Sequence, residues 1–205
     1  MVNMMHGSSI VILAPHVDDE LIGCFRQLSR GVVNDVFYFF DLDTERKIEA
    51  ERTAQAFGFT PHFKFEEKLL DKNATLYVPN IADWHPDHKA VNYLAKSLPN
   101  PKRYYSVDMN TIFDLLSPAM QSFKKRMLLE LYPSQEKLLG SNDKYFLFES
   151  DLPFDIRCTK TEGYVTIQCD PTNLEDIREI EQLAVKYPGR YIKTTKENIT
   201  YEFIP

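Results

Sequence analysis

Two short segments contain three of the chain's five histidines: His16, His85 and His88. The first segment reads A-P-H-V-D-D-E over residues 14–20, and the second reads D-W-H-P-D-H over residues 83–88. Imidazole and carboxylate groups can hold a zinc-like ion while leaving one coordination position open for water. The two segments therefore predict a metal-assisted hydrolase.

Each residue of this predicted centre can be given a role. His16 and Asp19 are three residues apart at a turn from strand to helix, so both side chains can reach one ion. His88 would supply a third ligand. A bound zinc ion, or another divalent ion in its place, lowers the pKa of its water from 15.7 to about 7. Asp18 is the candidate general base for that water, and His85 is the candidate to stabilise an oxyanion or to protonate a leaving group.

Structural interpretations compete with these roles. Either Asp18 or Asp19 could cap the first helix. Asp83 is either a partner that fixes the tautomer of a ligand histidine or an ordinary loop acid. Asp87 is predicted to cap the helix that follows the second segment. Trp84 could stack on a sugar ring or anchor the loop in the core.

The order of the elements predicts an α/β protein. Apolar runs over 9–14, 33–40 and 76–79 are typical of buried strands. The charged, amphipathic segment 44–57 is typical of a helix, with Gly58 at its C-cap. This alternation predicts a Rossmann-like three-layer sandwich with a mostly parallel sheet. Because ligands bind beyond the carboxyl ends of such strands, both histidine segments should lie at one edge of the sheet.

The remaining elements complete this prediction. Further elements are expected over 21–28 (helix), 63–65 (strand), 88–98 (helix), 103–107 (strand) and 118–139 (helix broken at Pro133). In the tail, strands over 163–169 and 190–203 should flank a helix over 173–186. No Pro-, Gly- or Ser-rich linker precedes the tail. Residues 1–205 are therefore expected to form one domain, with 151–205 as a C-terminal α+β extension.

Composition excludes several classes of function. A net charge of −6 argues against a nucleic-acid binder with a broad basic face. The densest basic run, residues 124–126, is interpreted as a solvated helix face. No apolar stretch approaches the roughly 20 residues of a membrane span. The three cysteines form no C-x-x-C pair, so reduced thiols in a cytoplasmic protein are expected. The oligomeric state stays open.

The two segments resemble those of the LmbE-like/PIG-L superfamily of zinc-dependent N-acetylglucosaminyl deacetylases. Residues 15–20 match its P-H-x-D-D-E motif, and residues 85–88 match its H-P-D-H motif. Arg46 and Glu49 resemble its R-x-x-E helix, and Lys125, Leu129, Ser134 and Gln135 resemble a later K-x-x-x-L…S-Q helix. The resemblance covers roughly residues 10–139.

The resemblance implies a Rossmann-like fold without a dinucleotide. It also implies zinc on His16, Asp19 and His88, with Asp18 as base and His85 on the oxyanion. The chain departs from the family at residues 41–44, D-L-D-T, where a glycine-bearing loop is common. It departs again at Tyr132 and Pro133, near a frequent histidine.

Substrate contacts are the least determined part of the site. Asp43, Arg46 and Trp84 are candidate contacts. Arg46 and Glu49 can also be interpreted as an exposed helical ion pair, and Ser134 and Gln135 as hydrogen bonders at a helix end.

The function expected from these residues is removal of an acetyl group from an N-acetylated amino sugar, or its conjugate, by zinc-activated water. The substrate would be a small molecule. One alternative is an inactive family member that binds a metal or a sugar conjugate. Another is a different Rossmann-like enzyme, which would need a phosphate-binding loop or a second cluster of metal carboxylates.

Overall fold

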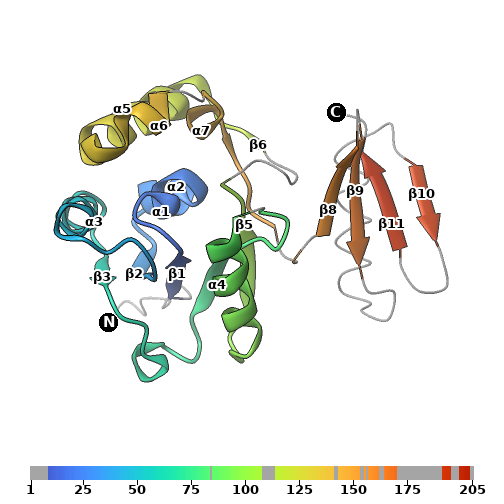
Figure 1. The fold of residues 1–205 in the computed structure, drawn as a ribbon, viewed down its shortest axis with the longest axis horizontal. Helices are drawn as coiled ribbons and strands as arrows, with labels where there is room; N and C mark the ends of the chain where they lie inside the picture. Colours follow the sequence, from blue (N-terminus) through green and yellow to red (C-terminus); the bar gives the residue numbers. More distant parts are fainter. Residues whose placement is uncertain are drawn as a thin grey trace, which may run out of the picture.

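A five-stranded parallel sheet in the order β3-β2-β1-β4-β5 forms the centre of the protein (Figure 1). Its strands are β1 (Ile10–Ala14), β2 (Val33–Tyr38), β3 (Thr60–His62), β4 (Thr75–Pro79) and β5 (Lys102–Tyr105). The computed structural model describes residues 9–83, 85–107, 114–140, 143–152, 155, 157–161, 164–169, 191–194 and 199–203. The predicted Rossmann-like α/β fold is confirmed.

Helices cover both faces of this sheet. They are α1 (Asp19–Gly23), α2 (Phe25–Ser29), α3 (Thr44–Phe57), α4 (Pro86–Lys96), α5 (Pro118–Leu131), α6 (Glu136–Gly140) and α7 (Lys144–Leu147). Two short 3₁₀ turns are also present: η1 (Glu67–Leu69) lies between β3 and β4, and η2 (Pro133–Gln135) lies between α5 and α6. The predicted helix over 44–57 is confirmed, and Gly58 ends it with φ of 79°. The predicted break at Pro133 is also confirmed.

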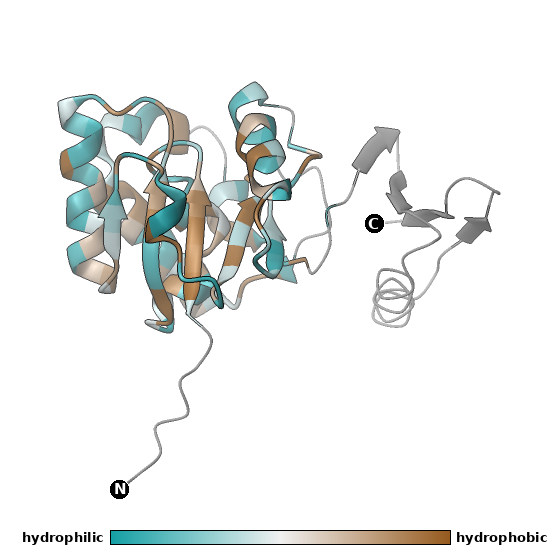
Figure 2. Ribbon diagram, turned by 90° about the horizontal axis from the view of Figure 1, so that it is seen from below, coloured by the Kyte–Doolittle hydropathy of each residue, from teal (hydrophilic) through white to brown (hydrophobic). Residues whose placement is uncertain are grey.

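Alternate strand residues supply two separate cores, because successive side chains of a strand point to opposite faces. Ile12 and Ala14 of β1 pack in the core that includes α1, α2, α3 and α5. Val11 and Leu13 pack in the core that includes Val91 of α4. Figure 2 shows apolar colouring on strands of the central sheet and mixed hydrophilic and apolar colouring on the helices around it. This two-faced burial explains why the strands read as continuous apolar runs.

Two sequence predictions about this part of the chain were wrong. The third strand was expected over 63–65 but lies at Thr60–His62, where it pairs only with β2 and so tolerates Pro61 at the sheet edge. The basic run 124–126 was expected to be solvated, and Lys125 and Arg126 are exposed, but Lys124 is fully buried. Its Nζ donates to the backbone oxygens of Ile22 and Phe148 at 2.6 and 2.9 Å. These two bonds engage two of the three N–H donors of the buried ammonium.

The other described strands form two smaller sheets. β6 (Asp114–Leu115) and β7 (Phe148–Glu149) pair antiparallel. The tail forms an antiparallel sheet in the order β10-β11-β9-β8, with β8 (Arg157–Thr161), β9 (Tyr164–Cys169), β10 (Tyr191–Thr194) and β11 (Ile199–Phe203). The helix expected over 173–186 lies outside the described residues, and a single domain stays a prediction. Among the described helices, none has both the length and the apolar content to cross a membrane.

We expect Gly23→Ala to destabilise the protein. A Cβ atom at Gly23 would lie 2.2 Å from a ring carbon of Tyr105, a fully buried residue of β5. Overpacking of this kind costs about 1–3 kcal/mol. Gly140→Ala is the matched control, because a Cβ atom there would meet nothing within 4 Å. Urea unfolding of both variants measures the effect, and equal stability of Gly23→Ala and the wild type would contradict this packing.

Candidate metal centre

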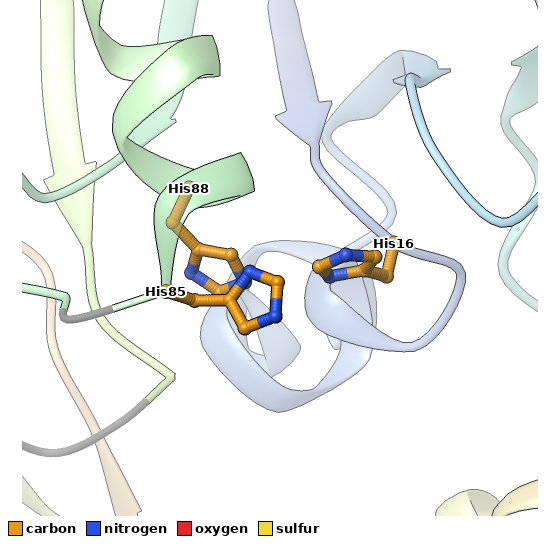
Figure 3. Close-up of side chains that lie close together, drawn as sticks. All are labelled: His16, His85 and His88. Atoms are coloured by element: carbon orange, nitrogen blue, oxygen red, sulfur yellow. The ribbon is translucent and has the colours of Figure 1, made fainter.

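The fold brings the two histidine segments to one edge of the sheet. The first follows β1 and the second follows β4, and these strands are parallel neighbours. The strand order changes direction at this pair, which is where α/β proteins of this type bind ligands. Figure 3 shows the rings of His16, His85 and His88 facing a common space between α4 and the turn after β1. The predicted placement is therefore found in the structure.

One carboxylate oxygen lies between two of the imidazoles. Asp19 Oδ2 is 3.2 Å from His16 Nδ1 and 3.3 Å from His88 Nε2. It also accepts the backbone N–H of His16 at 2.8 Å, which fixes the turn between strand and helix. Asp19 and His88 are each only 3% exposed. The three predicted ligands are thus within reach of a single ion.

Two further carboxylates hold the outer nitrogens of the same imidazoles. His16 Nε2 lies 3.0 Å from Asp87 Oδ2, and His88 Nδ1 lies 3.0 Å from Asp83 Oδ2. Asp83 is fully buried and also accepts the Ser106 hydroxyl and the backbone N–H of Val107. A carboxylate on the outer N–H of a histidine fixes its tautomer and turns the other nitrogen toward a metal. Of the two interpretations of Asp83, the structure favours the tautomer partner.

This arrangement calls for a positive charge at its centre. With their outer nitrogens donating to carboxylates, the neutral rings of His16 and His88 present lone pairs to the oxygen of Asp19. Burial alone would lower the pKa of each histidine, but the hydrogen bond and charge of Asp19 raise the pKa of His16 to about 9. The charge of Asp19 likewise raises the pKa of His88 to about 11. A proton between Asp19 and each imidazole nitrogen turns the contact into a hydrogen bond, and one divalent cation can replace both protons.

Asp87 was predicted to cap α4, and that prediction was wrong. The N-cap residue is His85, whose side chain accepts the backbone N–H of Asp87 at 3.3 Å. The carboxylate of Asp87 is thereby left to contact His16 on the other segment. The H-P-D-H spacing could have indicated that Asp87 belongs to the centre, because it places this carboxylate and two imidazoles within one helical turn.

His85 differs from the other two histidines. Its ring centre is 4.9 Å from that of His16 and 5.4 Å from that of His88, so its nitrogen could also reach a shared ion. Its Nδ1 accepts the backbone N–H of Asp87 at 3.3 Å and lies 3.7 Å from Asp87 Oδ2. When Nδ1 accepts this bond, a neutral ring carries its proton on Nε2. In that tautomer Nε2 donates a hydrogen bond, whereas ligation through Nε2 would require this proton to leave. This geometry favours the predicted donor role over a fourth ligand.

Asp18 is buried beside the centre in an unusual backbone conformation. Its φ is 120°, and its backbone N–H donates to Glu20 Oε2 at 2.9 Å. Its Oδ2 lies 3.1 Å from Arg46 Nη2. Burial and the charge of Asp19 raise the pKa of Asp18 well above its usual range, against the opposing charge of Arg46. A carboxylate with a raised pKa suits a general base near neutral pH.

Glu20 supports this turn, and sequence reasoning gave it no role. The side chain is fully buried, and its Oε1 accepts hydrogen bonds from the hydroxyls of Tyr38 and Tyr132 at 2.7 and 2.5 Å. Since its other oxygen receives the Asp18 N–H, Glu20 holds the strained residue in place. The two tyrosines come from β2 and the end of α5. Nothing in the sequence pattern pairs them with Glu20.

The centre opens into a cavity of about 610 Å³. Its lining comprises His16, Asp18, Asp19, Ile22, Asp41, Leu42, Asp43, Arg46, His85, His88, Val107, Gln135, Leu138 and Tyr145. Asp43 lines this cavity and also caps α3, where its side chain accepts the Arg46 N–H at 2.9 Å. Arg46 and Glu49 are 6% and 1% exposed, so the exposed ion pair is excluded. Trp84 lies outside the described residues.

No family model matches the chain, and no curated protein matches its sequence. Among solved structures, the chain is similar to the PH0226 protein from Pyrococcus horikoshii OT3. That similarity has 14% sequence identity and a TM-score of 0.30, and it covers 98% of this chain and 84% of the other. The roles of the residues described above therefore rest on their own geometry.

We expect Asp83→Asn to weaken zinc binding about 10–100-fold, the usual effect of losing the partner of a ligand histidine. The amide cannot hold the tautomer of His88 as the carboxylate does. Asp35→Asn is the matched control, because Asp35 Oδ1 contacts His62 Nε2 at 2.7 Å on the sheet edge away from the centre. Competition with a chromophoric chelator measures both affinities. If the two variants bind zinc equally well, Asp83 does not support a metal ligand.

Proposed function

We propose that this protein is a zinc-dependent hydrolase that removes the acetyl group from an N-acetylated amino sugar or its conjugate. The observation that carries the proposal is that Asp19 Oδ2 lies 3.2 Å from His16 Nδ1 and 3.3 Å from His88 Nε2 in the lining of a cavity. The resemblance of the two histidine segments to LmbE-like/PIG-L deacetylases supports the choice of substrate. Membership of that superfamily is part of the proposal.

His16, Asp19 and His88 would hold the ion. When bound, zinc would polarise the acetyl carbonyl and lower the pKa of a water molecule. Asp18 would take the proton of the water that attacks the amide carbon, and the Nε2–H of His85 would donate to the carbonyl oxygen as it becomes negative. Protonated Asp18 would then pass its proton to the departing nitrogen as the C–N bond breaks. The products are acetate and the free amine.

The cavity suits a ligand of modest size. Its volume of about 610 Å³ falls within the range of small-molecule sites. Leu42, Leu138 and Tyr145 supply apolar wall beyond the histidines, which can pack against the faces of a sugar ring or its conjugate. The proposal therefore includes a small-molecule amino sugar as the substrate. It also includes a cytoplasmic location for the protein.

We expect Asp18→Asn to keep its zinc while turnover falls about 10²–10⁴-fold, the usual contribution of general acid–base catalysis. Asparagine preserves shape and tolerates a positive φ better than most residues, so the fold should persist. Release of acetate from a panel of N-acetylated sugars and metal analysis by mass spectrometry give the two readouts. Asp71→Asn, in an exposed turn, serves as the control. Unchanged turnover in Asp18→Asn would remove Asp18 from the reaction.

The wild-type result separates the enzyme from its alternative. Zinc bound at one equivalent without turnover of any N-acetylated sugar would favour an inactive protein that binds a metal or a sugar conjugate. Acetate released in proportion to bound zinc supports the hydrolase.

We expect His85→Ala to retain zinc affinity and to lose turnover about 10²–10³-fold, as when one oxyanion donor is removed. The reason is that its capping bond leaves a donor on Nε2. Chelator competition and acetate release on the same variant distinguish the roles. Loss of zinc affinity comparable to that of His88→Ala would make His85 a ligand.

A further inference from the structure

Arg46 lines the cavity, but its guanidinium forms hydrogen bonds with other side chains of the protein. Nη2 donates to Asp18 Oδ2 at 3.1 Å. Nη1 donates to Glu49 Oε2 at 2.9 Å and lies 3.3 Å from Ser134 Oγ. The residue is only 6% exposed. Of the five N–H donors that a guanidinium carries, three on the terminal nitrogens are therefore used by groups of the protein.

The groups that hold Arg46 are themselves fixed. Glu49, 1% exposed, lies one turn further along α3. Its Oε1 accepts the backbone N–H of Ser134 at 2.9 Å, and its Oε2 accepts the Ser134 hydroxyl at 2.8 Å. The backbone N–H of Arg46 is capped by Asp43. A chain of hydrogen bonds thus runs from η2 through α3 to the carboxylate of Asp18.

We propose that Arg46 is a positioning residue for Asp18, braced by Glu49 and Ser134, and not a contact for the sugar. This inference rests on the proposed function, in which Asp18 is the base. A carboxylate has two oxygens, so Arg46 can fix Oδ2 while the other takes a proton from water. Glu20 holds the backbone of Asp18, and Arg46 fixes the rotation of its side chain.

Substitution of Arg46 by lysine tests this role through the kinetic constants. Lysine keeps the charge but carries its donors on one nitrogen atom, so it cannot bind Asp18 and Glu49 in the geometry of the planar guanidinium. A misplaced base lowers turnover, and a displacement near 1 Å can cost about 10²-fold. We expect Arg46→Lys to lower kcat on that scale with KM and zinc affinity unchanged. A sugar contact would instead raise KM.

A double-substitution cycle with Asp18→Asn makes the test specific. If Arg46 acts only through Asp18, Arg46→Lys will cause no further loss of kcat in the Asp18→Asn background. If Arg46 acts independently of Asp18, the fold-losses of kcat from the two substitutions will multiply in the double variant. Arg52→Lys is the matched control, because Arg52 is an exposed arginine of the same helix, and kcat should not change.

Ser134→Ala provides a second route if Arg46→Lys does not fold, which circular dichroism will reveal. It removes the hydroxyl shared by Arg46 and Glu49 and should lower kcat less than Arg46→Lys, again with no effect when Asp18 is asparagine. If the fold-losses of kcat multiply in the double variant, or if Arg46→Lys only raises KM, the positioning role is overturned. Because the wild type is active in either case, the proposed function stands. A zinc-loaded wild type that hydrolyses no N-acetylated sugar overturns the proposed function, and the positioning role with it.

Discussion

The interaction on which the site depends is the contact of two imidazoles with one carboxylate oxygen. Asp87 and Asp83 orient the rings of His16 and His88 through their outer nitrogens. The inner nitrogens, His16 Nδ1 and His88 Nε2, therefore face Asp19. Lone pairs and a carboxylate oxygen repel one another unless protons or a metal cation lie between them. The protein maintains this arrangement in a buried setting, where an unmet charge is most expensive.

The surrounding structure gives the buried charged groups beside the centre polar or charged partners. Breaking one partner of a buried ion pair typically costs about 3–5 kcal/mol, because the other charge is left uncompensated. Asp18 is matched by Arg46, and Arg46 by Glu49. Glu20 receives two tyrosine hydroxyls. These contacts come from β2, α3 and the end of α5, so the elements that build the fold also fix the geometry of the site.

The fold and the placement of the two histidine segments could be predicted because their signals are local. Apolar runs that end at a histidine segment place both segments at the carboxyl ends of strands, and Gly58 marks the end of α3. The supporting contacts could not be predicted in this way. Asp87 contacts a residue 71 positions away, and Tyr132 reaches Glu20 across 112 positions. Such pairs depend on how helices pack, which periodicity does not encode. The burial of Lys124 could not be predicted for the same reason, since the backbone oxygens that accept its hydrogen bonds belong to α1 and β7.

Zinc-edge X-ray absorption of the metal-loaded protein tests the central claim most directly. The geometry predicts two imidazole nitrogens and a carboxylate oxygen at about 2.0–2.2 Å from the metal. Substitution of His16 or His88 should each remove one imidazole, and substitution of His85 should remove none. A spectrum with three imidazoles, or one that His16→Ala leaves unchanged, would contradict the account.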